Sequence, residues 1–280
     1  METIFPRDRV TIVAVLNATP DSFSDGGRFV TQGGQLRLDE AIDAAAGLID
    51  AGAHVLDVGG ESTRPGAREV PARVERDRVV PVVEALSKRF AAPVCVDTRK
   101  LPVAAAALDA GASIVNDVSG LAHDPGLAGL AAQRGVSLVL GHLRGTPETM
   151  QDAPTFADVL AEVAGELEES AGKARAAGVP DAQICVDPGI GFGKNLEQNL
   201  KLLAGAGELR RRIGLPVLVG PSRKSFLGAL TGDPVHERDA ATDAACAVAA
   251  FVGADAVRVH AVAGARRAVA VGRALRGATS

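Results

Sequence analysis

The sequence has 280 residues, of which 47% are hydrophobic, and its formal net charge at pH 7 is −4. A chain of this length can bury a large core, and the lack of a Ser/Pro-rich linker favours a single domain over residues 1–280. The negative charge argues against a general nucleic-acid surface, and no apolar run approaches the roughly 20 residues that cross a bilayer. We therefore expect neither nucleic acid nor a membrane among its partners.

Two features bear on the cellular compartment. The first nine residues are rich in charge, so we expect no signal peptide. The three cysteines, Cys95, Cys185 and Cys246, are far apart and each lies in an apolar run. This pattern is typical of buried thiols in a reducing cytoplasm, and no Cys or His pairing suggests zinc. The sequence therefore predicts a cytoplasmic protein.

Short β-branched runs alternate with alanine-rich helical stretches along the chain. The predicted strands are continuously apolar, which is typical of parallel strands covered on both faces. Eight such units in this length predict a (β/α)8 TIM barrel. A doubly wound open sheet is the alternative, but no GxGxxG motif follows the first strand. The predicted strands are 11–16, 54–58, 93–96, 113–115, 137–140, 184–186, 217–219 and 256–259; the helices that follow them are 38–51, 72–90, 102–110, 125–133, 156–177, 195–212, 237–252 and 264–276.

Polar residues follow all eight predicted strands, at the ends where barrel enzymes carry their chemistry. A purely structural barrel would not need a polar group at every one of these positions. The residues are Asn17, Asp57 with the loop 59–67, Asp97, Asn116 with Asp117, His142, Asp187, Ser222 with Arg223 and Lys224, and Arg258 with His260.

The sixth unit shows the plan most clearly, in the stretch 185–194. Its apolar lead-in ends on the carboxylate of Asp187, and Pro188 stops the strand because proline has no N–H for the ladder. The glycines at 189, 191 and 193 predict a loop whose backbone can approach a ligand closely. A helix then follows from about residue 195.

Asp97, Asn116 and Asp187 stand on three different strand ends, near Lys224. Carboxylates and an amide together suit a flat heterocycle with a guanidine-like edge, which Asp187 could take with two parallel hydrogen bonds. Lys224 could then meet a carbonyl or ring nitrogen. The alternative is that these groups cap helices or pair with basic residues in the barrel mouth.

A second set consists of Asn17, Arg64, Arg258 and His260. The guanidinium fork of arginine matches phosphate, and an amide oxygen with phosphate oxygens can hold Mg²⁺. The set therefore predicts a polyanionic leaving group whose departure is helped by charge neutralisation. The alternative for Arg258 is an ion pair with a neighbouring carboxylate.

Ser222 belongs to the turn 220–224, where a hydroxyl and backbone N–H groups could bind a carboxylate. A plain helix N-cap is an equally good interpretation. Among the other histidines, His54, His123 and His236 suit surface or capping roles. His142 ends the fifth strand and receives no catalytic role.

Seven stretches stand out as motifs: LNATPDSFSDGG at 16–27, DVGGESTRPGA at 57–67, VDT at 96–98, VND at 115–117, DPGIGFGKN at 187–195, SRKS at 222–225 and RVH at 258–260. The first, the second and that of the sixth strand are long and specific. Together, and in this order over almost the whole chain, they resemble the dihydropteroate synthase family of the folate pathway.

The resemblance implies a (β/α)8 barrel, usually a homodimer, that joins 6-hydroxymethyl-7,8-dihydropterin diphosphate to p-aminobenzoate with Mg²⁺ and releases pyrophosphate. It implies an SN1-like reaction, inhibition by sulfonamides, and closure of the first two loops over the site. Carried over by motif, Asp97, Asn116, Asp187 and Lys224 hold the pterin, Asn17 binds Mg²⁺, Arg64, Arg258 and His260 hold the diphosphate, and Thr63, Pro65, Phe192 and Ser222 border p-aminobenzoate. Asp97, Lys224 and Arg258 are the expected catalytic residues.

The sequence departs from the family pattern after the fifth strand. The family usually has Met-His-Met there, and this chain has Gly141-His-Leu. A missing methionine beside the pterin predicts weaker pterin binding by about 1–2 kcal/mol through lost apolar burial.

Two other functions fit parts of the pattern. A pterin-dependent methyltransferase that serves a corrinoid protein would share the barrel and the acids, but it would not need the loop 63–66 or the set 222–224. A non-catalytic pterin-binding paralogue would be expected to have damaged loops, whereas the motifs are intact.

Overall fold

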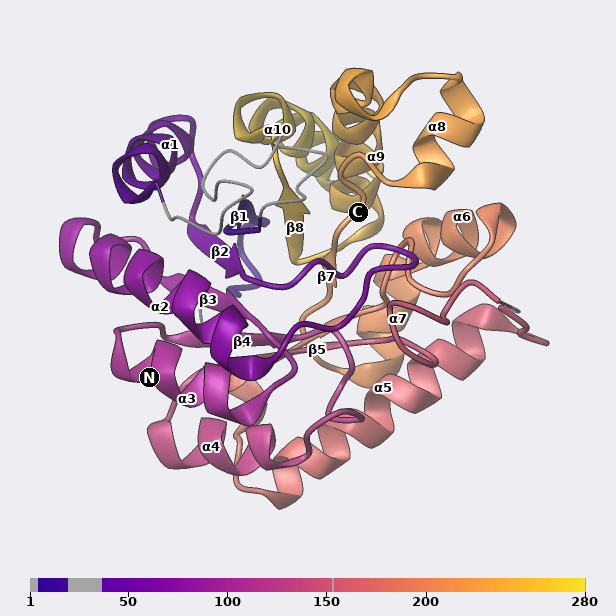
Figure 1. Cartoon of the computed structure of the whole chain (residues 1–280). Coiled ribbons are helices and arrows are strands. Elements are labelled where there is room, and N and C mark those ends of the chain that lie inside the picture. The colour runs from indigo at the N-terminus through magenta and orange to yellow at the C-terminus, as the bar shows by residue number, and fades with distance from the viewer. Residues whose placement is uncertain (1–4, 20–36, 153, 280) are drawn as a thin grey trace.

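The computed structural model describes residues 5–19, 37–152 and 154–279, and within them parallel strands form a barrel inside a ring of helices (Figure 1). The strands are β1 Thr11–Asn17, β2 Val55–Gly59, β3 Val94–Asp97, β4 Ile114–Asp117, β5 Ser137–Gly141, β6 Ile184–Asp187, β7 Leu218–Val219 and β8 Ala256–Val259. The helices are α1 Leu38–Asp50, α2 Ala72–Arg89, α3 Leu101–Asp109, α4 Gly126–Arg134, α5 Val159–Ala176, α6 Leu196–Ala204, α7 Ala206–Ile213, α8 Ser225–Thr231, α9 Asp239–Val252 and α10 Val262–Ala278, with 3₁₀ turns at Asp181–Gln183 and Val235–Glu237.

The strand order is β6-β5-β4-β3-β2-β1-β8-β7, with every pair parallel. A bridge between Val186 and Val217 joins β6 to the segment before β7 and closes the barrel. The (β/α)8 barrel predicted from the sequence is therefore confirmed, and the open-sheet alternative is wrong. All parallel strands point their carboxyl ends the same way, so the loops after them meet at one mouth.

The barrel interior is apolar in its middle and polar toward the carboxyl ends of the strands. One buried apolar side chain from each strand, together with Phe5, forms a separate interior cluster: Val13, Val55, Cys95, Ile114, Val139, Cys185, Leu218 and Ala256. Side chains two residues apart on a strand face the same way, so the next interior level lies toward the mouth. It consists of Val15, Asp57, Asp97, Asn116, Gly141, Asp187, Gly220 and Arg258. Strand alternation thus places a level with charged side chains between the apolar cluster and the mouth of the barrel. This charged level forms the floor of the mouth.

Two helical expectations need correction. The predicted helix 195–212 is two helices, α6 and α7, which meet at Gly205. A Cβ at Gly205 would stand 2.4 Å from Cδ1 of Leu160 on α5, so the close approach of α5 requires glycine at the break. The short helix α8, which follows Lys224, was not predicted. Most of the motif 16–27 lies outside the described residues.

Among the described helices, none has the length and apolarity that a bilayer crossing needs.

Candidate active site

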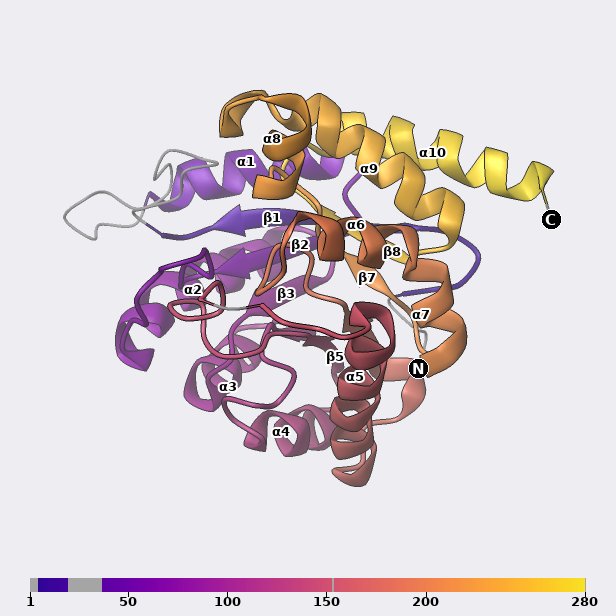
Figure 2. The same ribbon diagram turned by 90° about the vertical axis from the view of Figure 1, so that its right-hand side faces the viewer.

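A cavity of about 410 Å³ opens at the mouth of the barrel. In the side view of Figure 2, the strands run toward this end and the C-terminus lies at the other. Most of the residues predicted for the site line the cavity: Asn17, Thr63, Arg64, Pro65, Asp97, Phe192, Ser222, Lys224, Arg258 and His260. Asn116 borders a much smaller cavity beneath it, together with Asp57 and Arg258.

Arg258 lies in the middle of the charged level. Its Nη1 is 3.6 Å from Oδ2 of Asp57, and its Nη2 is 3.4 Å from Oδ2 of Asp187. Although burial works in the opposite direction, the carboxylates of Asp187 and Asp57 raise the pKa of Arg258 above its ordinary value. The ion-pair interpretation of Arg258 is therefore confirmed, and the guanidinium lies between Asp187 and the open cavity.

The floor of the site holds buried polar atoms without partners. Oδ1 of Asp97 and both side-chain polar atoms of Asn116 have no hydrogen-bond partner among the residues that the structure describes. An unmade hydrogen bond of this kind costs about 1–3 kcal/mol. A polar ligand that forms hydrogen bonds with these atoms would remove this cost. Burial and the neighbouring carboxylate of Asp57 raise the pKa of Asp97 to about 8.

Lys224 and Phe192 form one wall of the cavity. Nζ of Lys224 lies 3.7 Å from the centre of the Phe192 ring, which is a cation–π contact. A Cβ at Gly191 would stand 2.8 Å from Cδ of Lys224, so glycine at 191 makes room for the lysine. Burial and the guanidinium of Arg258 lower the pKa of Lys224 to about 7.

Asp187 uses its two oxygens differently. Oδ1 accepts a hydrogen bond of 2.8 Å from the N–H of Gly189, and Oδ2 faces Arg258. The loop turns back tightly here, because Gly189 has a φ of +68° and a Cβ on it would stand 2.0 Å from the carbonyl oxygen of His142. One oxygen therefore holds the glycine loop and the other is directed toward the centre of the site.

Ser222 and His260 contact each other at the wall of the cavity. Oγ of Ser222 lies 2.9 Å from Nδ1 of His260 and accepts a hydrogen bond of 3.2 Å from the backbone N–H of His260. The N-cap of α8 is Lys224, so the interpretation of Ser222 as a helix cap is wrong. The hydroxyl is held at the cavity wall by its histidine neighbour.

Four polar strand-end residues are absent from the lining of this cavity, namely Asn116, Asp117, His142 and Asp187, of which Asp187 contacts it through Arg258. Asp117 accepts hydrogen bonds from the backbone N–H groups of Ser119 and Leu121, so it shapes the turn after β4. His142 is buried between Lys194 and Glu166. His142 does not line the cavity, and its lack of a catalytic role stays a prediction.

From the sequence, Asp57 is identified only as a polar strand end. In the structure it is 3% exposed, lines the cavity and pairs with Arg258. Strand alternation could have identified it, since Asp57 faces the same way as Val55 in the interior cluster. Arg238, just before α9, also lines the cavity, and no sequence motif indicated it.

The model for the pterin binding enzyme family matches residues 13–260. A dihydropteroate synthase from Synechocystis is 44% identical over 253 residues, which cover 90% of this chain and 85% of the relative. The Escherichia coli dihydropteroate synthase is 44% identical over 249 residues, covering 89% and 86%. The chain belongs to the dihydropteroate synthase family of pterin-binding enzymes.

Solved structures of dihydropteroate synthases agree with this assignment. The Yersinia pestis enzyme, in a sulfonamide drug complex, has a TM-score of 0.91 and 41% identity, covering 97% of this chain and 96% of that one. The Xanthomonas albilineans enzyme with 4-aminobenzoic acid has a TM-score of 0.86 and 42% identity, covering 96% and 94%.

Gly141 stands where the resemblance to the family leads us to expect methionine. A Cβ at Gly141 would stand 2.6 Å from Cα and 2.8 Å from the carbonyl oxygen of Val118, so the backbone after β4 fills the space beside it. Gly141→Met should therefore destabilise the fold by about 1–3 kcal/mol through overpacking. Urea unfolding measures this, with Gly172→Met on α5 as the control, since a Cβ at Gly172 meets nothing within 4 Å. A stable variant with tighter pterin binding would show instead that Val118 moves aside.

Asp97→Asn should make folding stability less dependent on pH. The pKa of Asp97 is about 8 in the folded chain and about 4 in an unfolded one, so between these values the folded state binds more protons. Stability of the native protein from this group therefore falls as pH rises from 4 to 8. As pH rises over that range, the free energy of unfolding of the variant should increase by about 1–2 kcal/mol relative to that of the native protein. Urea unfolding at pH 5 and pH 9 tests this, and the exposed Asp109→Asn should show no gain.

Proposed function

We propose that the cavity at the mouth binds 6-hydroxymethyl-7,8-dihydropterin diphosphate and p-aminobenzoate and joins them into 7,8-dihydropteroate. The main observation in support of this proposal is that one cavity is lined by acidic side chains at its floor and by cationic side chains at its sides. Asp97 and Asp57 line its floor, and Arg64, Lys224 and Arg258 line its sides. A flat, amine-rich ring suits the acids, and a diphosphate suits the cations.

The pterin is assigned to the charged level of the barrel. Asp187, Asn116 and Asp97 offer acceptors and an amide from three strand ends, and Lys224 completes the set. The unpartnered atoms of Asn116 and Asp97 support this placement, because a ring bearing amino and N–H groups would satisfy them. Oδ2 of Asp187 becomes available to the ring when Arg258 turns toward the diphosphate.

The diphosphate is assigned to Arg64, Arg258 and His260 at the rim. All three line the cavity, and their positions allow charge neutralisation of a leaving pyrophosphate without a protein nucleophile. Thr63, Pro65, Phe192 and Ser222 border the remaining space and are assigned to p-aminobenzoate. The hydroxyl of Ser222 is assigned to its carboxylate, so sulfonamides, which mimic this acid, are expected inhibitors.

Mg²⁺ fits the donor set around Asn17. A Cβ at Gly59 would stand 3.9 Å from Oδ1 of Asn17 and 3.8 Å from Oδ2 of Asp97, so glycine keeps this corner of the cavity open. No cluster of three or more His, Cys, Asp or Glu suited to a metal occurs among the described residues. This agrees with Mg²⁺, which takes few protein ligands and completes its shell with phosphate oxygens and water. Bound there by Asn17, the ion would neutralise charge on the diphosphate.

The reaction is proposed to be SN1-like. The C–O bond to the diphosphate breaks first, and the bonding electrons leave with pyrophosphate. Asp97, on the floor, stabilises the positive charge left on the pterin methylene group, and Arg258 stabilises the departing anion. The amino nitrogen of p-aminobenzoate then attacks the methylene carbon and loses a proton.

The first experiment is condensation of dihydropterin diphosphate with labelled p-aminobenzoate, with Mg²⁺ and then with EDTA. Metal-dependent formation of labelled dihydropteroate supports the proposal in full, and product that persists in EDTA refutes the Mg²⁺ role. Folded protein that binds pterin by calorimetry but forms no product would indicate a binding paralogue. No pterin binding at all would refute the assignment of Asp97, Asn116 and Asp187.

A homodimer is proposed on the evidence of exposed apolar side chains on two neighbouring helices. Val248 and Phe251 on α9 are 44% and 40% exposed, and Val271 and Leu275 on α10 are 57% and 55% exposed. Helices α9 and α10, which carry these side chains, pack against each other (Figure 1). Light scattering after size exclusion measures the mass in solution, and a monomer at micromolar concentration would refute the dimer.

A cytoplasmic location is proposed from the cysteines. Cys95, Cys185 and Cys246 are all unpaired thiols and all buried. Thiols that form no disulfide suit a reducing compartment.

A further inference from the structure

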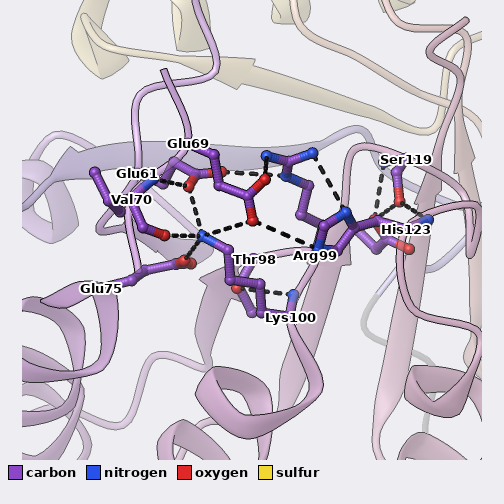
Figure 3. Close-up of polar contacts among 10 residues, drawn as sticks. Glu61, Glu69, Val70, Glu75, Thr98, Arg99, Lys100, Ser119 and His123 are labelled. Carbon is purple, nitrogen blue, oxygen red and sulfur yellow. Dashed lines mark hydrogen bonds and ion pairs between the residues drawn. The ribbon is translucent and has the colours of Figure 1, made fainter. Parts of the chain in front are cut away.

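Buried charges gather at the base of the loop 60–71, which joins β2 to α2 (Figure 3). Glu61 is 9% exposed, Glu75 1%, and Arg99 and Lys100 5% each. Glu69, an exposed residue of the same loop, also pairs with Arg99 at 3.2 Å, so two buried cations are shared by two buried carboxylates and one exposed carboxylate. Although burial favours the neutral acid, the hydrogen bond from Lys100 lowers the pKa of Glu61.

Lys100 is the centre of this cluster. Its Nζ lies 2.5 Å from Oε2 of Glu61, 2.7 Å from Oε2 of Glu75 and 2.7 Å from the carbonyl oxygen of Val70. An ammonium group has three hydrogens to donate, and these three acceptors use all of them. The three acceptors come from the beginning of the loop, from α2 and from the end of the loop.

The same contacts close the neck of the loop. Oε2 of Glu61 also accepts a hydrogen bond of 2.9 Å from the backbone N–H of Val70. Both backbone polar groups of Val70 are thus bound to the cluster, and residues 61 and 70 are held together. The loop tip lies across the mouth (Figure 1), where the N–H of Gly66 donates to the carbonyl oxygen of Pro147 at 2.9 Å.

The cluster also joins the loop to the end of β3. Arg99 and Lys100 follow Asp97 directly after Thr98, and Nε of Arg99 donates to Oε1 of Glu61 at 3.1 Å. The N–H of Lys100 donates to Oγ1 of Thr98 at 3.2 Å. The position of the loop neck is therefore fixed relative to Asp97 on the cavity floor.

We propose that Lys100 is a positioning residue that fixes the neck of the loop 60–71 and so sets where Thr63, Arg64 and Pro65 stand in the cavity. This inference rests on the proposed function, which assigns those three residues to p-aminobenzoate and the diphosphate. Buried ion pairs add little net stability compared with apolar packing, so geometry is the main contribution of this cluster. Lys100 itself does not line the cavity.

The test is Lys100→Met, which keeps the length of the side chain and removes its three donors. The KM for p-aminobenzoate should rise about 10- to 100-fold, since small misplacements of binding groups have effects of this size. Affinity for a pterin that lacks the diphosphate, measured by calorimetry, should stay within about twofold, because such a ligand does not engage Arg64 and the Asp97 level is untouched. Amide hydrogen exchange should become faster at residues 62–69 by a larger factor than in the barrel strands, where any increase reports only the loss of overall stability.

The single substitution leaves two buried carboxylates facing one cation, so a charge-balanced variant is needed beside it. Lys100→Met with Glu75→Gln keeps Glu61 paired with Arg99 while the neck loses Lys100, and the same changes are expected. Lys88→Met, on the exposed pair with Glu84, is the control and should behave as native.

Native KM for p-aminobenzoate with native exchange at 62–69 in the double variant would overturn the inference. Faster exchange throughout the barrel with an unchanged KM would also overturn it, because it would show a role in stability alone. Failure of the native protein to form dihydropteroate would refute the proposed function instead. The exchange measurement would then still decide whether Lys100 fixes the loop.

Discussion

Arg258→Met should lower kcat/KM for dihydropteroate formation by about 100- to 1,000-fold. The guanidinium lies 3.6 Å from Asp57 and 3.4 Å from Asp187, and it lines the cavity. Methionine fills much of the same volume without charge or donors. Arg258→Lys restores the charge but not the planar fork, so it should recover only part of the rate.

The same substitution should change stability in a pH-dependent manner. Removal of one partner from a buried ion pair costs about 3–5 kcal/mol, because the other charge remains buried. Burial already raises the pKa of Asp57, and without Arg258 this carboxyl should bind a proton more readily. The folded variant then binds more protons than its unfolded chain. The difference in free energy of unfolding between native protein and variant should therefore become smaller from pH 8 to pH 5.

Kinetics and urea unfolding of the Arg258 variants measure these two effects. Arg212→Met is the control, since Arg212 is 46% exposed and paired with Glu208 on the helix surface. Turnover near the native rate in Arg258→Met would remove this residue from the catalytic set. A difference in free energy of unfolding that grows toward low pH would contradict the ion-pair explanation.

Asp187→Asn should lower pterin affinity and kcat/KM by about 10- to 150-fold, the value of one charge-assisted hydrogen bond. The substitution is selective, because the asparagine carbonyl can still accept from the N–H of Gly189 while its amide replaces the oxygen that faces Arg258. The glycine loop should therefore keep its shape, and the loss should fall on the ligand.

Calorimetry with the pterin substrate and a thermal melt separate the two contributions. The expected result is weak binding together with a lower melting temperature, since Arg258 loses one of its two buried carboxylate partners and keeps only Asp57. The exposed Asp181→Asn, which changes a surface pair with Arg175, should leave binding unchanged. Native pterin affinity in Asp187→Asn would show that this carboxylate does not hold the ring.

The fold was predictable because its information is local. Each strand is an apolar run ended by a polar residue, and all eight were located within a few residues. The break at Gly205 was not predictable, since it depends on Leu160, which lies far away in sequence. The same holds for α8, a helix of seven residues without an acidic first turn or a side-chain cap.

The sequence predicted which residues line the site better than it predicted how they contact one another. Motif and strand ends identified most residues that line the cavity. They could not show that Arg258 covers Asp187, nor that one oxygen of Asp187 is already used by the N–H of Gly189. The Lys100 cluster was missed because its partners, Glu61 and Glu75, lie 39 and 25 residues away.

The join between β6 and β7 is the least hydrogen-bonded part of the barrel. Strand β7 has two residues, and a single bridge between Val186 and Val217 closes the ring beside it. Asp187 ends the strand on one side of this seam, and Lys224 follows the strand on the other. A pterin bound by both residues would connect the ends of β6 and β7 where the backbone joins them by a single bridge. The occupied enzyme should therefore be mechanically stiffer than the empty one, with slower hydrogen exchange at the amide of Val186.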